Sequence, residues 1–254
     1  KTKTLSTQDS KVISKVILFV VSPCAILTSF MIEFTPDKLF GLGLALLGAF
    51  IVHVIYIPLT ELLSKIFGFV PIEKATVIYS NSGNLIIPLV GAILGKEWVL
   101  YTSGYMIVQT ILLWTHAKSL VCNERQYDIK KIFLNVNVIA IMIGIILFLS
   151  QFQLPGLVVT TFDKVGSMIG PLAMIVIGML IGEMNFKDIF SEKRTYLICF
   201  MRLIVYPFII VLVFQFTGLS TISSDANQIF LITILAASAP AAATITQFAQ
   251  LYNK

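Results

Sequence analysis

The apolar stretch 75–95 carries polar residues at its centre, where the middle of a membrane-spanning helix would lie. They surround Gly83 and precede Pro88, and they are Ser80, Asn81, Ser82 and Asn84. Proline removes a backbone donor and clashes with the preceding turn, while glycine lowers the cost of unwinding. Unwound backbone survives at membrane depth only where protein or a wet cavity satisfies its polar groups. The sequence therefore predicts two half-helices joined by a polar stretch.

A second stretch, 227–249, has a similar composition around Pro240. Small residues flank this proline, and the polar groups nearby are Ser238, Thr244, Thr246 and Gln247. Small residues let another backbone approach closely. If the two breaks cross, half-helix N-termini point into one site, and those ends suit an anion. Taken singly, each stretch has an alternative interpretation as a proline kink with polar side chains that bind neighbouring helices.

The charges favour one class of ligand. Neither 75–95 nor 227–249 contains Asp, Glu, Lys or Arg. A dedicated cation site inside a membrane usually has a buried carboxylate. We therefore expect an organic anion held by amides, hydroxyls and helix dipoles, with sodium bound by carbonyls and hydroxyls as the alternative.

Prolines repeat at matched positions in the two halves of the chain. The first set is Pro23, Pro58 and Pro88, and the second set is Pro171, Pro207 and Pro240. Five apolar spans separate each proline from its partner, and an odd number of crossings inverts the second copy in the membrane. An inverted repeat of broken helices is typical of secondary transporters, with the substrate near the midplane.

The composition predicts an all-α polytopic membrane protein. The 254 residues include only 12% charged residues, against about 25% in soluble domains, and the mean hydropathy is +0.92. About 20 apolar residues cross a bilayer as a helix. Eight stretches meet this length: 12–32, 39–64, 75–95, 98–116, 132–150, 164–182, 195–216 and 227–249.

Lysine and arginine fall mainly on one side of these predicted spans. Cytoplasmic loops carry the excess of positive charge in membrane proteins, so we expect both observed ends on the cytoplasmic side of the cell membrane. The opposite side holds only Lys38, Lys96 and Lys164, and Arg202 lies inside a span. The net charge of +5 is then a topology signal, and we expect the bilayer as partner and no nucleic acid.

Arg202 and Glu61 are the candidates for a gate or a buried charge, with a pairing of the two as one hypothesis, and the alternative for Arg202 is a headgroup anchor. His53 and His116 are lone histidines, for which packing roles are expected. The three cysteines have no metal-ligand spacing. No nucleotide-binding loop or catalytic constellation is present, so we expect neither an enzyme nor a cofactor or metal.

Several motifs resemble the auxin efflux carrier family, which includes the plant PIN-formed auxin carriers and bacterial permeases for malate or malonate. Asn81 precedes Pro88 by seven residues, as in the family's first crossover helix. The other motifs are V-V-S-P-C-A-I-L at 20–27, G-P-L-A-M-I-V-I-G-M-L-I-G at 170–182, M-R-L-I-V-Y-P at 201–207 and A-S-A-P-A-A-A-T-I-T-Q-F-A-Q-L-Y-N at 237–253. The family has ten spans in two inverted sets of five, and eight are predicted here, so the first and last would be missing.

The resemblance implies an elevator-type carrier. Its scaffold helices would be 12–32 and 132–182, its transport helices 39–116 and 195–249, and residues 117–131 would link the two repeats. A homodimer would form through the scaffold helices. The residues implied to bind a substrate carboxylate at the crossover are Asn81, Ser82, Asn84, Pro88, Ser238, Pro240, Thr244 and Gln247.

The short central loop favours malate or a similar acid over auxin as the substrate. Two other functions remain open at this point. One is a sodium-coupled symporter of the bile-acid type, and the other is a transporter-like sensor that binds a ligand without moving it.

Overall fold

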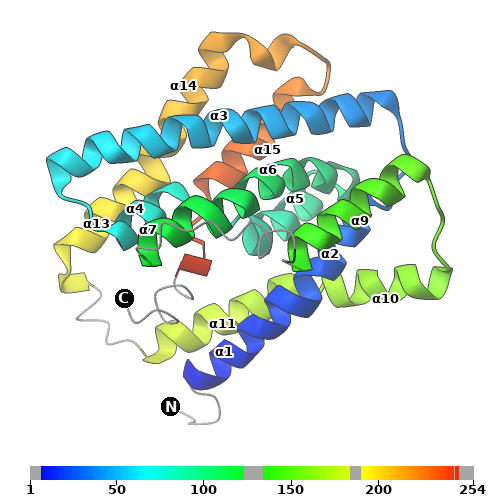
Figure 1. Cartoon of the computed structure of the whole chain (residues 1–254), viewed down its shortest axis with the longest axis horizontal. Helices are drawn as coiled ribbons and strands as arrows, with labels where there is room; N and C mark the ends of the chain where they lie inside the picture. Colours follow the sequence, from blue (N-terminus) through cyan, green and yellow to red (C-terminus); the bar gives the residue numbers. More distant parts are fainter. Residues whose placement is uncertain (1–6, 123–133, 135, 184–189, 243, 246–254) are drawn as a thin grey trace. The chain divides into compact units, whose positions relative to one another are not determined.

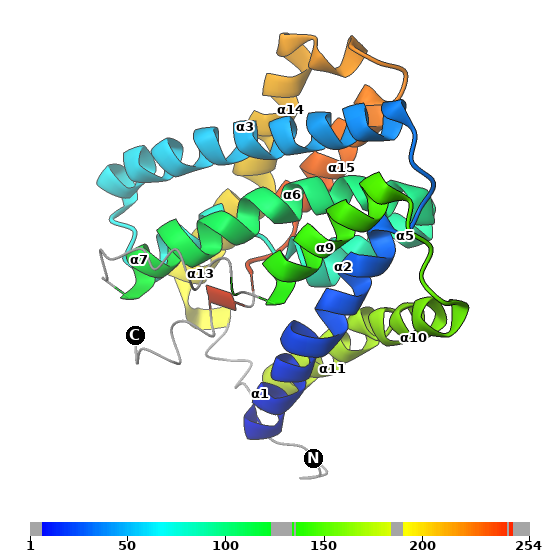
Figure 2. The same cartoon turned by 45° about the vertical axis from the view of Figure 1, so that its right-hand side comes forward.

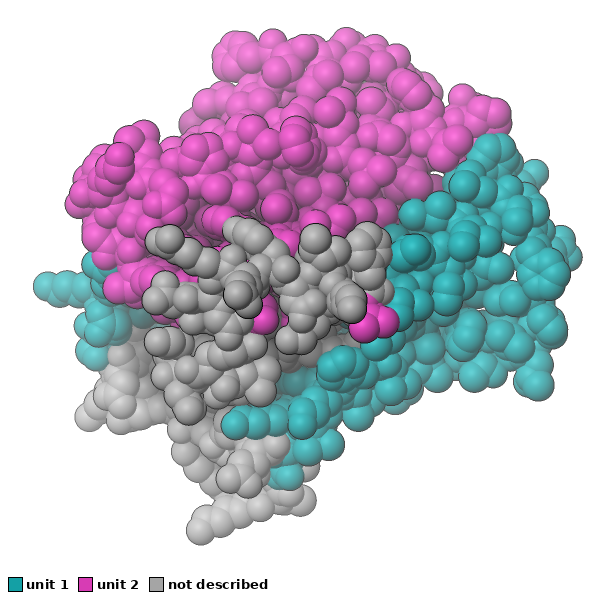
Figure 3. Space-filling model, in the orientation of Figure 1, with its two compact units in different colours: residues 1–34, 135–195 teal, residues 35–134, 196–254 magenta. Residues whose placement is uncertain are grey.

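The computed structural model describes residues 7–122, 134, 136–183, 190–242 and 244–245. It is built from helices, and the chain forms two compact units (Figure 3). Unit 1 comprises residues 1–34 and 135–195, and unit 2 comprises residues 35–134 and 196–254. Within the described residues, four helical segments are long and apolar enough to cross a membrane: Asp9–Phe30, Pro36–Phe67, Gly156–Val176 and Lys193–Thr217. The predicted all-α membrane fold is confirmed.

Unit 1 consists of helices from both halves of the sequence. They are α1 (Thr7–Val16), η1 (Ile17–Val21), α2 (Ser22–Phe30), α9 (Val136–Ser150), α10 (Gly156–Gly166) and α11 (Ile169–Glu183). Helix α2 packs against α9 and α10, and α1 packs against α11. Glycine permits the first two contacts, because a Cβ on Gly144 would lie 2.5 Å from the Phe30 ring and one on Gly166 would lie 2.9 Å from the Ala25 backbone.

Unit 2 holds the remaining helices, and α3 (Pro36–Phe67) is the longest of them. The others are α4 (Pro71–Ile78), η2 (Ser82–Ile86), α5 (Ile87–Ile93), η3 (Lys96–Trp98), α6 (Val99–Leu112), η4 (Leu113–Ala117), α7 (Lys118–Cys122), α13 (Lys193–Phe200), η5 (Met201–Val205), α14 (Tyr206–Thr217), η6 (Leu219–Thr221) and α15 (Ala226–Ser238). Helix α3 runs along α6 and is crossed by α15, as both views show (Figures 1 and 2). The two broken helices therefore lie in the same unit as the long helix that supports them.

Three prolines follow widened turns of π-helix. The segments η1, η2 and η5 each have five residues and end two positions before Pro23, Pro88 and Pro207, respectively. A proline ring clashes with the carbonyl one turn earlier, and a π turn is a recurrent way to relieve such a conflict inside a helix. Pro58, in contrast, lies within the continuous helix α3. The prolines that repeat in sequence thus have more than one structural effect.

Helices are found in the predicted spans, but several of them begin or end at other residues than predicted. The stretch 75–95 is broken into α4, η2 and α5, as expected, and the helix of 227–249 ends at Ser238. The helix predicted to begin at 164 instead begins at Ile169, after the separate helix α10. Gly166 marks this boundary, because the α2 backbone lies against it.

Close approach of α3 to α6 depends on Gly104, and this gives a test of the fold of unit 2. A Cβ there would lie 2.7 Å from the Cβ of Ala45, with α3 backbone atoms at 3.1 Å. We expect Gly104→Ala to lower the free energy of unfolding by about 1–3 kcal/mol, because backbone must move. Gly43→Ala is the matched control, since nothing lies within 4 Å of its new methyl group. Thermal unfolding of the two purified variants in detergent checks this, and equal melting temperatures would contradict the packing.

Candidate functional site: the crossing of two broken helices

The breaks after α4 and α15 cross within unit 2. Ser80 and Ala241 form an antiparallel bridge. The amide of Asn81 donates to the carbonyl of Pro240 at 2.7 Å, and the amide of Ala242 donates to the carbonyl of Tyr79 at 3.0 Å. The sequence predicts an anion site on the condition that the two breaks cross, and in the structure they do cross.

Local backbone preferences explain where each helix stops. Tyr79 ends α4 with φ −101° and ψ 127°, and Ala239 ends α15 with φ −60° and ψ 152°. Ala239 precedes Pro240, and a residue before proline is pushed out of the α region toward extended backbone. The two extended segments then form hydrogen bonds with each other. A single broken helix inside a membrane would have no such partner for its exposed backbone groups.

Gln109, from α6, satisfies the polar groups of the first break. Its Oε1 accepts from the amide and the hydroxyl of Ser80, at 3.0 and 2.7 Å. Its Nε2 donates to the Ser80 carbonyl and to the Ser82 hydroxyl oxygen, each at 2.8 Å. One buried amide side chain thus replaces the helical hydrogen bonds that the break removes.

Arg202, from η5, holds the ends of both half-helices. Its Nε and Nη2 donate to the carbonyl of Ala239 at 3.0 and 2.8 Å, and its Nη1 donates to the carbonyls of Val77 at 2.8 Å and Ile78 at 3.4 Å. The last carbonyls of a helix have no partner within it. The guanidinium therefore caps α4 and α15 together, although only 2% of the residue is exposed.

The crossing also balances the charge of this buried arginine. A charge inside a membrane is costly unless it is compensated. Helix C-termini each carry about half a negative charge, and Arg202 contacts the C-terminal ends of two helices, α4 and α15. The two ends together therefore offset roughly one positive charge.

That N-terminus begins at Ser82, directly after the bridge, and η2 continues into α5. The first amides of a helix have no acceptor within it, and they carry partial positive charge. The side chain of Asn81 stands at this position, is half-buried and makes no capping hydrogen bond to η2. An anion could accept hydrogen bonds here without a metal or a basic side chain.

The predicted substrate-binding residues differ in their burial and in their hydrogen bonds. Ser82 is buried and bonded to Gln109, and Ser238 donates to the Ile234 carbonyl at 2.6 Å. Pro240 is exposed and Thr244 is half-buried. The side chains of Asn84 and Pro88, and the whole of Gln247, lie outside the described residues. Among the predicted residues, Asn81 stands at the N-terminus of η2 with a half-buried side chain.

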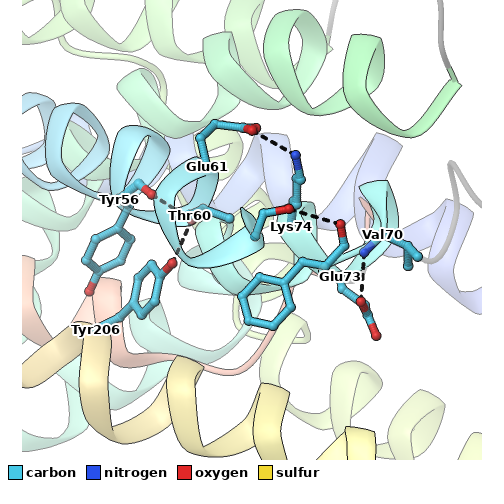
Figure 4. A network of polar contacts seen from close by, with 9 residues as sticks. Tyr56, Thr60, Glu61, Val70, Glu73, Lys74 and Tyr206 are labelled. Carbon is cyan, nitrogen blue, oxygen red and sulfur yellow. Dashed lines mark hydrogen bonds and ion pairs between the residues drawn. The ribbon is translucent and has the colours of Figure 1, made fainter. Parts of the chain in front are cut away.

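The expected pairing of Glu61 with Arg202 is wrong. Glu61 forms an ion pair with Lys74 at 2.8 Å, which joins the end of α3 to α4 (Figure 4). In the same network the Val70 amide donates to the Glu73 carboxylate at 2.8 Å, at the start of α4 (Figure 4). Arg202 instead finds its partners among helix-end carbonyls, because its side chain lies at the crossing and not at a membrane boundary.

Sequence reasoning did not find Gln109. It lies inside the predicted span 98–116, and a polar amide residue within an apolar helix could have indicated such a role. Its partner Ser80 is 29 residues away in sequence. Arg202 was found as an unusual charge, but its role as a cap for two half-helices requires that they meet, which spacing alone does not establish.

Two crossed broken helices within an apolar helical unit are the arrangement of a membrane transporter. The sequence matches the family described as membrane transport protein over residues 1–127 and 120–254. The chain belongs to this family, which is the auxin efflux carrier family that the motifs predicted. The comparison with curated proteins finds no match for the chain.

The cap made by Arg202 can be tested by removing it. We expect Arg202→Met to lower the free energy of unfolding by at least about 3 kcal/mol, because several buried carbonyls lose a charged donor. Arg202→Lys should be intermediate, since an ammonium group is too compact to reach both helix ends. Lys65→Met, which removes an exposed positive charge at the end of α3, is the control. Melting temperatures in detergent measure the effect, and an unchanged value for Arg202→Met would refute the cap.

Proposed function

We propose that this membrane transport protein is a secondary carrier for a small organic anion, such as malate or another carboxylate. The observation that carries the proposal is the antiparallel bridge between Ser80 and Ala241. It brings the N-terminus of η2 and the side chain of Asn81 to the point where α4 and α15 end. A carboxylate bound there would accept hydrogen bonds from first-turn amides and from Asn81.

An anion suits this site better than a cation. The described residues of the two breaks, 79–82 and 239–242, include no acidic side chain. The carbonyl ends of α4 and α15, which could attract a cation, are already occupied by Arg202. A sodium-coupled symporter of the bile-acid type would need oxygen ligands beyond these, so we place it second.

The elevator mechanism is part of the same proposal. Unit 2 contains both breaks, Arg202 and Gln109, so the whole site could move as one body without breaking the hydrogen bonds that hold it. Unit 1 would then be the scaffold and would carry the homodimer contact. We further propose the cell membrane as the location, with both observed ends of the chain cytoplasmic.

Thermal stabilisation of the purified protein tests the substrate class. A ligand that binds only the folded protein raises the melting temperature as its concentration exceeds the Kd. We expect a shift with dicarboxylates that does not require sodium. A shift that appears only with sodium would favour the bile-acid type of symporter, and binding without flux in liposomes would favour a sensor.

Asn81 gives the mutational test of the site. We expect Asn81→Ala to weaken carboxylate binding about tenfold, which corresponds to about 1.4 kcal/mol for one lost hydrogen bond to a charged group. The melting temperature without ligand should stay within a few degrees of the wild-type value. Asn227→Ala, at an exposed position near the start of α15, should change neither quantity. Isothermal titration with the best acid of the panel measures this, and wild-type affinity in Asn81→Ala would exclude the proposed site.

A further inference from the structure

Two buried polar atoms behind the crossing have no hydrogen-bond partner among the described residues. They are the Nε2 of His53 and the hydroxyl of Tyr56, while the nearby hydroxyl of Tyr105 interacts with Ser80 of the first break. His53 is 1% exposed and the two tyrosines are fully buried. Buried polar atoms are almost always satisfied, so each exception needs an explanation. The three residues lie in one cluster, because the ring centroids of His53 and Tyr105 are 5.3 Å apart and Tyr56 follows His53 by one turn of α3.

One contact shows which nitrogen of the His53 imidazole carries a hydrogen. Its Nδ1 lies 2.8 Å from the carbonyl of Ala49. A carbonyl can only accept, so Nδ1 carries the proton of the neutral ring, and Nε2 presents a lone pair. The unpartnered atom of His53 is therefore a buried base, with nothing in the described chain donating to it.

Every group that faces this base is neutral or positive. From α4, the Tyr79 ring lies 6.0 Å away, and from α6 the facing group is Tyr105. Electrostatic interactions reach His53 from Arg202 in η5 and from His116 in η4. The ring centroid of Tyr206, from α14, lies 4.7 Å from that of Tyr56. The Tyr206 hydroxyl donates to the Thr60 hydroxyl oxygen at 2.7 Å, because that of Thr60 donates to the Tyr56 carbonyl (Figure 4). Carboxylates are absent from this set of described neighbours, so a proton on His53 would add an uncompensated charge beside Arg202.

A bound carboxylate would change that balance. The positive charge of Arg202 is already offset by two helix ends, so an anion at the crossing brings uncompensated negative charge, one unit for a monovalent acid, into a low-dielectric interior. Tyr79 connects the two places, because its carbonyl accepts from Ala242 at the bridge and its ring faces His53. An additional proton on the buried base would restore neutrality. Imidazole is the side chain whose ordinary protonation range spans neutral pH.

We propose that His53 is the proton-binding site of this carrier, and that it takes up one proton when the anion binds at the crossing. The inference rests on the proposed function. The proton adds to Nε2 and the ring becomes a cation, with the hydroxyl oxygens of Tyr56 and Tyr105 as its potential acceptors. Without the anion, burial in the apolar interior disfavours the charged ring, so proton and anion bind together. The carrier is then an electroneutral proton–anion symporter for a monovalent acid, and it moves one net negative charge with a dicarboxylate such as malate.

The chain has only two histidines, which makes the test direct. In the His116→Gln variant, labelled with ¹⁵N-histidine, His53 gives the only imidazole signals. At pH 7.5 we expect the neutral ring protonated on Nδ1 without ligand, and the imidazolium form on saturation with the acid that stabilises the wild-type protein. A ring that stays neutral with the acid bound would overturn the proposal.

The pH dependence of binding gives an independent measurement. If one proton is taken up with the anion, Kd rises up to tenfold for each unit of pH between 6.5 and 8.5. The acid is chosen to be fully ionised over this range. The dependence should persist in His116→Gln and disappear in His53→Gln, which keeps a polar side chain but cannot gain charge. Loss of the dependence in His116→Gln alone would assign the proton to the other histidine and overturn the proposal.

The outcomes separate this inference from the function on which it rests. Binding of an acid with no dependence on pH, together with a neutral His53, refutes the proton site and leaves the anion carrier standing. Failure of every acid to bind the wild-type protein between pH 5.5 and 8.5 refutes both. If His53→Gln does not fold, the spectroscopic test still decides, because it needs no substitution at position 53.

Discussion

A broken helix inside a membrane must find partners for the backbone groups that the break exposes, and the structure of unit 2 depends on this constraint. Lipid offers no hydrogen bonds, so the partners must come from the protein. The breaks after α4 and α15 meet the requirement in three ways: they pair with each other, Gln109 binds the first break, and Arg202 binds the carbonyl ends of both. Each of these contacts lies inside one compact unit.

The same contacts sort the helix ends at the crossing by their charge. The carbonyl ends of α4 and α15 contact Arg202, while the first amides of η2 begin at Ser82. The positively charged side chain thus binds the negative helix ends, and the positive end of η2 remains for the proposed anion. The proposed site therefore needs no charged side chain in the two breaks themselves.

Small residues allow the helices of this arrangement to pack closely. Gly41 and Gly48 of α3 lie under Tyr101 and Phe230, and Gly104 lies against Ala45. The long helix can therefore approach α6 and α15 closely enough to bring His53 and Tyr56 next to the crossing. The unpartnered polar atoms of His53 and Tyr56 lie where α3 packs against these helices, buried from solvent.

The sequence by itself determined the class of fold, the two breaks and the family. The length of an apolar stretch decides whether it can span a membrane, and proline and glycine disturb only the helical turns next to them. These features therefore follow from short segments of sequence. The tertiary structure decided what satisfies the breaks. Arg202 meets carbonyls 37 and 125 residues away, and Gln109 meets Ser80 across 29 residues. Sequence spacing carries no information about such contacts, because they exist only once α4, α6, η5 and α15 have packed together.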